Sequence, residues 1–181
     1  HLRAVSVGSI NVMSSPDGIN WRLRPMPSSS SWRSVAYGNG TFAAVRENGD
    51  ASTQVMTSPD GVTWTTRAAS QQATWTAVTF GNNTFVAVGY TNQGVVMTSP
   101  DGITWTNRTR SDNMCCIVNY VGFGNGRVIS LAGGQMSTSP NGITWTDRAS
   151  LEHYNRSVTF GNGVFVSVTS DGSGNRVYSS P

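Results

Sequence analysis

The sequence contains no lysine, and only 12% of its 181 residues are charged. All twelve basic residues are therefore arginines, which are spread along the chain and leave a net charge of only +3. A nucleic-acid-binding surface needs clustered basic residues interleaved with aromatic ones, and the sequence has no such stretch. We therefore expect no nucleic-acid partner and a surface that relies on hydroxyl and amide groups.

Cysteines and long apolar runs are equally scarce. The two cysteines, Cys115 and Cys116, are adjacent, which provides no disulfide framework and favours two thiols over a strained vicinal disulfide. No apolar run approaches the roughly 20 residues of a membrane helix, so we expect no membrane insertion. The chain begins at His1 rather than Met, as a processed product or a fragment would.

Metal and cofactor motifs are also lacking. His153 has no partner at a metal-ligand spacing, and the stretch Asp171–Asn175 resembles part of a calcium loop without its closing glutamate. No phosphate-binding loop is present. We therefore expect neither a metal nor a cofactor.

What the sequence does contain is a repeat. The motif Ser-Pro-Asp/Asn-Gly-x-Thr/Asn-Trp occurs four times, with its prolines at 16, 59, 100 and 140, which are 43, 41 and 40 residues apart. A second motif, an aromatic residue followed by Gly-Asn, starts at residues 37, 80, 123 and 160 and keeps the same phase. The chain is therefore a run of about four and a third copies of one unit of roughly 41 residues.

Each unit is predicted to form four short antiparallel strands. Asn-Gly supplies the positive φ angles of one tight turn, and Pro-Asp-Gly supplies another. Four strands in about 40 residues is the size of a β-propeller blade, whereas a β-solenoid uses shorter rungs and a sandwich does not repeat its sequence so closely. We expect one all-β domain over 1–181, with units at 1–31, 32–74, 75–117, 118–154 and 155–181. The first and last units are incomplete, so the fold is either five blades or a segment of a larger propeller.

These motifs carry a family resemblance over nearly the whole chain. Ser-Pro-Asp-Gly-x-Thr-Trp resembles a shortened Asp-box, the hairpin of sialidase-type propellers, with one residue fewer between Asp and Gly. The alternation with Gly-Asn-Gly-x-Phe-Val-Ala-Val is similar to repeats of bacterial surface and phage tail or fibre proteins. The resemblance implies a propeller fold and a place outside the cell or on a virion, but no catalytic role for the motif, because Asp-boxes lie away from sialidase active sites.

The turn order predicts two different ends of the blades. In an up-and-down blade, the Asn-Gly and Pro-Asp-Gly turns share one end, which we call the uniform face. The other connections share the opposite end, the variable face, where loops of differing length suit recognition. Aromatic, arginine and acidic residues in or beside these loops are the candidate ligand-binding residues: Trp32, Arg46, Glu47, Trp75, Tyr90, Arg110, Asp112, Glu152 and Tyr154. For Trp32 and Trp75, packing in the core is the competing prediction.

The motif residues themselves are predicted to be structural. The tryptophans should fill the core between blades, and an arginine three residues after each of them should cover a tryptophan face or pair with a motif aspartate. These structural residues are Asp17, Trp21, Asp60, Trp64, Asp101, Trp105 and Trp145.

The function predicted from these observations is non-catalytic recognition of a glycan or a cell-surface receptor, by a secreted or virion-surface protein. A structural role, in which other chains of a larger assembly cover the variable face or the incomplete ends, is the alternative. A sialidase-like glycoside hydrolase is a remote one, because the acidic residues show no recognisable catalytic arrangement and the chain is too short for a six-bladed ring. No catalytic residue is therefore assigned.

Overall fold

The computed structural model describes residues 4–8, 11–28, 30–110, 117–148, 155–169 and 177–180, which form five antiparallel sheets and one short 3-10 helix. The strands are β1 (Ala4–Val7), β2 (Val12–Ser15), β3 (Arg22–Arg24), β4 (Trp32–Gly38), β5 (Thr41–Arg46), β6 (Val55–Ser58), β7 (Thr65–Arg67), β8 (Thr74–Gly81), β9 (Thr84–Tyr90), β10 (Gly94–Ser99), β11 (Thr106–Arg108), β12 (Val118–Gly124), β13 (Arg127–Ala132), β14 (Gln135–Ser139), β15 (Thr146–Asp147), β16 (Asn155–Gly161), β17 (Val164–Thr169) and β18 (Val177–Ser180). The helix η1 (Ala51–Thr53) lies between β5 and β6.

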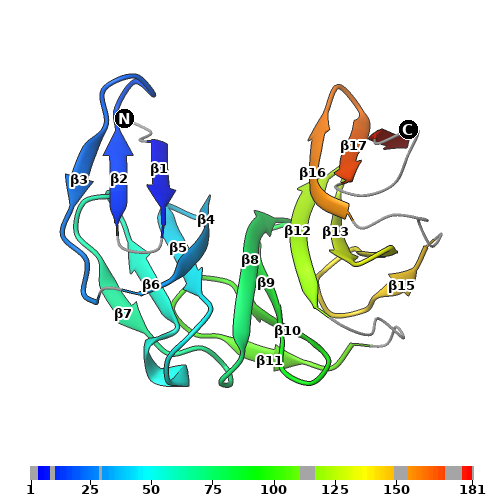
Figure 1. Cartoon of the computed structure of the whole chain (residues 1–181), viewed down its shortest axis with the longest axis horizontal. Coiled ribbons are helices and arrows are strands. Elements are labelled where there is room, and N and C mark those ends of the chain that lie inside the picture. The colour runs from blue at the N-terminus through cyan, green and yellow to red at the C-terminus, as the bar shows by residue number, and fades with distance from the viewer. Residues whose placement is uncertain are drawn as a thin grey trace.

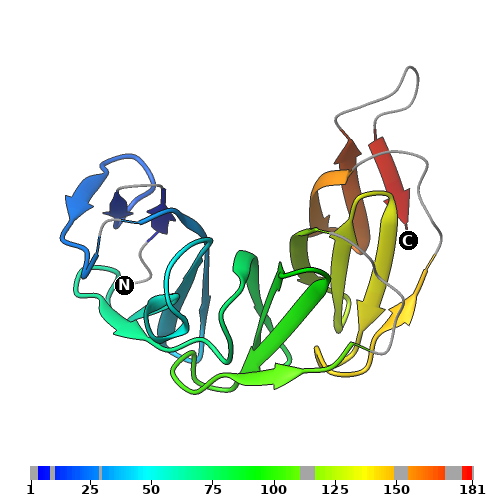
Figure 2. The ribbon, with the colours of Figure 1, turned by 60° about the horizontal axis from the view of Figure 1, so that its bottom comes forward.

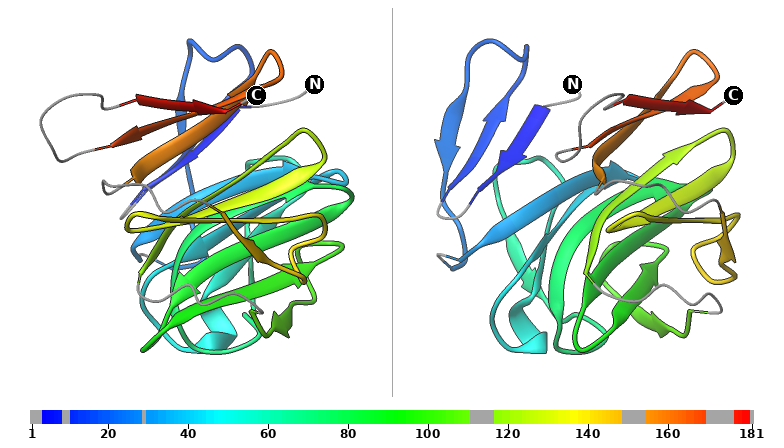
Figure 3. Two further views of the ribbon diagram at one scale, coloured as in Figure 1. Left: turned by 90° about the vertical axis from the view of Figure 1, so that its right-hand side faces the viewer. Right: turned by 45° about the vertical axis from the view of Figure 1, so that its right-hand side comes forward.

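The sheets are β-propeller blades, as predicted. Three of them have four strands in chain order, β4 to β7, β8 to β11 and β12 to β15, while the first (β1 to β3) and last (β16 to β18) have three. The long first strands β4, β8, β12 and β16 stand beside one another on the inner side. The five sheets follow an arc that stays open, with the first and last sheets at its two ends (Figure 1, Figure 2). Side views show the sheets stacked face to face along this arc (Figure 3).

The predicted Asn-Gly turns have the required backbone. Asn39, Asn82, Asn125 and Asn162 have φ angles of 46° to 51°, a left-handed region in which asparagine is well tolerated. The Asn82 side-chain amide then donates to the carbonyl of Pro140 in the next sheet at 3.0 Å, and Asn39 does the same to Pro100. Both kinds of repeated turn therefore meet on one face, which confirms the uniform face expected from the sequence.

The Pro-Asp-Gly turns are held by their own side chains. Asp101 accepts hydrogen bonds from the backbone N–H groups of Ile103 at 2.8 Å and Thr104 at 2.9 Å, and from the hydroxyl of Ser99 at 2.9 Å. The Ser99 hydroxyl oxygen in turn accepts from the backbone N–H of Gly102. The other three turns repeat this pattern, including the fourth, where Asn141 takes the place of aspartate.

The core lies between the sheets rather than along the axis. Each cluster of buried residues joins two successive sheets, for example Val45 and Val55 of the second sheet with Met97 and Trp105 of the third. Trp64 and Trp145 are buried in the same way, so the predicted core role of these three tryptophans is confirmed. Trp21 is the exception at 41% exposed, because the face of the first sheet that carries it has no sheet against it.

The strand-ending arginines have a different partner from the one predicted. The Nε atoms of Arg24, Arg67, Arg108 and Arg148 each donate to a hydroxyl of the neighbouring third strand, at 2.8 to 3.0 Å. Among the described residues, none of these four arginines lies over a tryptophan ring or forms an ion pair with a motif aspartate. These arginines therefore fasten the outermost strand to its sheet.

Candidate functional site

The two tryptophans proposed to stack on a ligand are buried. Trp32 is 2% exposed and Trp75 is 0% exposed, each in the core between its own sheet and the preceding one. A β-bulge just after each tryptophan reverses the alternation of side chains, so the indole turns into the core. The ligand-stacking prediction for both residues is wrong, and the competing prediction of a packing role is correct.

Arg46 is also unavailable to a ligand. It is 8% exposed, its guanidinium donates to the hydroxyls of Ser30 and Thr53, and it lies 5.7 Å from the ring centre of Trp32. Burial lowers the pKa of Arg46, partly offset by the negative charge of Asp50. Its predicted binding role is therefore wrong: the head group holds the loop after β5 against the loop before β4.

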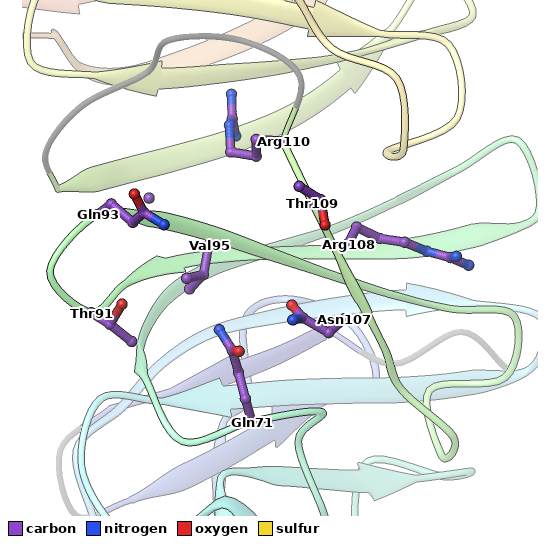
Figure 4. A pocket seen from close by; sticks show the side chains of 9 residues that line it. Gln71, Thr91, Gln93, Val95, Asn107, Arg108, Thr109 and Arg110 are labelled. Atoms are coloured by element: carbon purple, nitrogen blue, oxygen red, sulfur yellow. The ribbon is translucent and has the colours of Figure 1, made fainter.

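The variable face carries a hollow of about 300 Å³ over the third sheet, which we call the Gln71 hollow. It lies where the β9–β10 turn, the loop before β8 and the end of β11 meet, and its lining residues are Gln71, Thr91, Gln93, Gly94, Val95, Asn107, Arg108, Thr109 and Arg110. The amide groups of Gln71 and Asn107 face one another across it, whereas Arg108 extends away (Figure 4). None of the nine residues is acidic, and most of them present an amide or a hydroxyl.

A second hollow of about 270 Å³ adjoins the first, and Thr91 lines both. We call it the Tyr90 hollow; Glu47 and Tyr90, two of the predicted site residues, line it. Glu47 also forms an ion pair with Arg33 from strand β4, so its carboxylate is fixed at the rim. Tyr90 is partly exposed and supplies the aromatic surface that the buried tryptophans do not.

Arg110, the third predicted residue to reach a hollow, is anchored from the next sheet. Its guanidinium lies 4.3 Å from the ring centre of Trp145 and donates to the hydroxyl of Ser130 at 3.4 Å. A cation held over an indole face keeps its charge while losing freedom of movement. Arg110 therefore presents a positioned positive charge at the edge of the Gln71 hollow.

Gln54, which was not among the predicted site residues, connects two loops that line the hollows. It is 1% exposed; its side-chain oxygen accepts from the backbone N–H of Ala73, and its NH₂ donates to the carbonyls of Ala73 and Glu47. A buried amide must satisfy its hydrogen-bonding groups, and here it does so by joining the loop after β5 to the loop before β8. No repeated motif marks this position, because the glutamine lies outside both of them.

The remaining predicted residues, Asp112, Glu152 and Tyr154, lie outside the described residues, as do the two cysteines. Within the described ranges, no three of His, Cys, Asp and Glu gather closely enough to hold a metal ion. In the same part of the chain, no helix is both long and apolar enough to cross a membrane.

Fold and site together define a β-propeller in the form of an open arc, with a polar recess on its variable face. The chain belongs to the DUF6242 beta propeller domain family, whose model matches residues 15–157. No curated protein shows significant similarity to it.

Several solved structures share the fold at low sequence identity. A structure of YCF48 bound to D1 peptide is 16% identical with a TM-score of 0.66, covering 92% of this chain and 56% of its own. A gluconolactonase from Xanthomonas campestris is 11% identical with a TM-score of 0.67, covering 92% and 65%. The computationally designed Ika4 protein is 17% identical with a TM-score of 0.62, covering 89% and 98%. The chain thus spans little more than half of YCF48, and these similarities establish the fold alone.

Proposed function

We propose that this chain is a non-catalytic binding module that takes up an oligosaccharide, free or on a cell-surface receptor, at the Gln71 hollow. The observation that carries the proposal is the lining: amides and hydroxyls line a hollow without any acidic residue. Each amide offers both donors and an acceptor, which suits the dense hydroxyl groups of a sugar. Tyr90 in the adjoining hollow adds a surface on which the next ring of the ligand stacks.

The same lining argues for binding without hydrolysis. Glycosidases of the common types place two carboxyl groups about 5 to 10 Å apart on either side of the scissile bond. The Gln71 hollow contributes none, and the carboxylate of Glu47 at the Tyr90 hollow is paired with Arg33. Location outside the cell or on a virion is part of the proposal, and it draws on the likeness of the repeats to bacterial surface and phage tail proteins.

A glycan array followed by calorimetric titration of the best ligand tests the proposal. Gln71→Ala and Asn107→Ala are each expected to weaken binding about tenfold, the effect of removing roughly one well-made hydrogen bond. Thr104→Ala is the matched control, because Thr104 is an exposed residue of the same sheet on the uniform face. Its affinity is expected to equal that of the unaltered chain.

Two results would contradict the proposal. One is a folded chain that binds no glycan on the array. The other is binding that both alanine variants leave unchanged. Because YCF48 was solved with a bound peptide, a peptide array is run in parallel. Peptide binding that depends on Gln71 and Asn107, without sugar binding, would assign the hollow to a protein ligand instead.

A further inference from the structure

A hollow of about 570 Å³ lies at the outer rim of the uniform face, where the repeated turns of the first and second sheets meet. We call it the Arg22 hollow, and its lining residues are Pro16, Asp17, Asn20, Arg22, Arg24 and Val62. Both arginines belong to β3, the outermost strand of the first sheet, at the left of Figure 1. Val62 belongs to the second sheet, so the hollow is a feature of the junction between two sheets.

The two arginines of this hollow lie on the same side of their strand. Arg22 and Arg24 are two residues apart in β3, and side chains alternate along a strand. Their partners in β2 are Ser14 and Val12, and Val12 is buried in the core shared with the second sheet. The Nε atom of Arg24 donates to the Ser14 hydroxyl at 2.8 Å, which positions the guanidinium. In the described part of the chain, no carboxylate forms an ion pair with either arginine.

The first sheet departs from the repeat at this hollow. The residue after the motif tryptophan is Arg22 in the first sheet, whereas the next three sheets have threonine there: Thr65, Thr106 and Thr146. The residue before the tryptophan is Asn20, and the other sheets again have threonine: Thr63, Thr104 and Thr144. Three sheets form the same turn and strand with threonine at both positions, so the fold does not require the arginine or the asparagine.

The carboxylate of Asp17 is already bound by its own turn. Its Oδ1 accepts from the Ser15 hydroxyl and from the backbone N–H groups of Ile19 and Asn20, each at 2.8 Å. Its Oδ2 accepts from the Asn20 side-chain amide at 2.8 Å. These hydrogen bonds, that of the Asn20 backbone above all, lower the pKa of Asp17, so the group stays ionised. Two arginines and one aspartate leave the lining with one net positive charge.

We propose that the Arg22 hollow binds a tetrahedral oxyanion, the group shared by sulfate and phosphate and by their esters. A guanidinium presents its donors in a planar fork that pairs with two oxygens of an anion. A carboxylate has two oxygens, which one arginine occupies, whereas a sulfate or phosphate ester offers three. Arginines two residues apart in a strand have their Cα atoms about 7 Å apart, so both side chains reach one such group. The second hydrogen of the Asn20 amide adds a neutral donor.

Calorimetric titration at low ionic strength tests the site with inorganic sulfate, inorganic phosphate, galactose 6-sulfate and glucose 6-phosphate. Arg22→Thr gives the position the residue of the other three sheets and is expected to weaken binding at least tenfold. Arg127→Thr is the matched control, because it removes the same charge from an exposed residue of the fourth sheet. Its affinity is expected to equal that of the unaltered chain. Tighter binding of a sugar ester than of the matching inorganic ion would identify the oxyanion as part of a saccharide, and equal affinity would identify the oxyanion alone.

Asp17→Asn supplies a change in the opposite direction. Removal of the negative charge is expected to tighten binding about threefold. The turn is expected to persist, because Asn141 accepts the equivalent backbone hydrogen bond in the fourth sheet. Circular dichroism of each variant checks that it is folded. A folded chain that binds none of the four anions, or equal losses for Arg22→Thr and Arg127→Thr, would overturn the proposal.

Discussion

Three aspartates, Asp17, Asp60 and Asp101, each act as acceptors for the backbone of their own turn. These hydrogen bonds favour the ionised carboxylate, and the largest contribution to the lowered pKa comes from the backbone N–H three residues on: Asn20, Thr63 or Thr104. Desolvation opposes the effect, least at Asp17 among the causes there and more prominently at Asp101, where it ranks second, and the hydrogen bonds outweigh it at all three positions. The motif aspartate thus stabilises its own turn on the uniform face and has no role as a reactive group.

Replacing one of these aspartates tests this role. Asp101→Ala removes the acceptor for Ile103, Thr104 and Ser99, and is expected to lower the free energy of unfolding by about 1 kcal/mol. Asp101→Asn is the matched control, because Asn141 makes the same two backbone hydrogen bonds at 2.9 and 3.0 Å in the fourth turn. Urea unfolding of both variants provides the measurement, and equal losses for Ala and Asn would show that the hydrogen bonds contribute little.

The lowered pKa values also predict how stability depends on pH. A carboxyl whose pKa is lower in the folded chain stabilises the fold above its unfolded pKa, which is about 3.9 for aspartate, and loses that contribution as pH falls through the folded value. The free energy of unfolding is therefore expected to decline below about pH 4. In the double variant Asp60→Asn, Asp101→Asn the decline should be shallower. Identical pH profiles for the two chains would contradict the assignment.

At the scale of the strand, the sequence predicts alternation correctly until a bulge intervenes. The repeats place the turns and the motif tryptophans, because Gly, Asn and Pro fix local backbone conformation regardless of the surroundings. The first strands all shift register near their start, at Trp32/Ser34, Trp75/Ala77, Val118/Tyr120 and Asn155/Ser157. Trp32 therefore shares the face of Val35, three residues away, although strict alternation places the two on opposite faces. No single residue type marks this shift, so the burial of Trp32 and Trp75 was not predictable with certainty.

The candidate site was less predictable than the strands. The loop that contains Gln71 was correctly placed on the variable face, but the hollow forms only because the loops of neighbouring strands converge there. Of the candidate ligand-binding residues, Tyr90 and Arg110 line hollows, whereas Arg46 is turned inward by hydrogen bonds to Ser30 and Thr53. Composition alone does not distinguish an arginine whose guanidinium is available to a ligand from one whose guanidinium is used up in hydrogen bonds to neighbouring loops.

Contact between neighbouring first strands yields a prediction about glycine. A Cβ atom built on Gly81 would lie 2.1 Å from the ring of Phe123 in the next sheet, whereas one built on Gly161 meets nothing within 4 Å. Gly81→Ala is therefore expected to cost about 1 to 3 kcal/mol through overpacking. Gly161→Ala, at the same position of the repeat, is expected to be close to neutral. Thermal unfolding of the two variants checks the pair, and equal losses would show that the sheets do not approach as closely as described.

For the whole molecule, stability is expected to be highest in the middle of the arc. Strand β9 lies in a sheet with a neighbour on each side, and Phe85 to Val88 are fully buried. Strands β1 and β18 lie in sheets that are covered on one side only, and each has one unpaired edge in the described sheets. In stacked repeats, each unit is stabilised by its interfaces with neighbouring units. The first and last sheets of the arc have one such interface each, so we expect their strands to be less stable.

Native-state hydrogen exchange of the unaltered chain tests this gradient. Backbone amides of β9 are expected to exchange near the rate of global unfolding, and those of β1 and β18 at least tenfold faster. Equal protection across the five sheets would contradict the prediction and would indicate that the arc unfolds as one cooperative unit.

The apolar core that joins each sheet to the next has a consequence for how the gene of such a chain changes over generations. Because each junction joins the same kinds of residue, duplication or deletion of one whole unit in the gene places familiar neighbours side by side at the new junction. No compensating substitution is needed at such a junction. Recombination between repeats is therefore expected to add or remove whole sheets at little cost to packing, while the variable-face loops lie outside these core contacts.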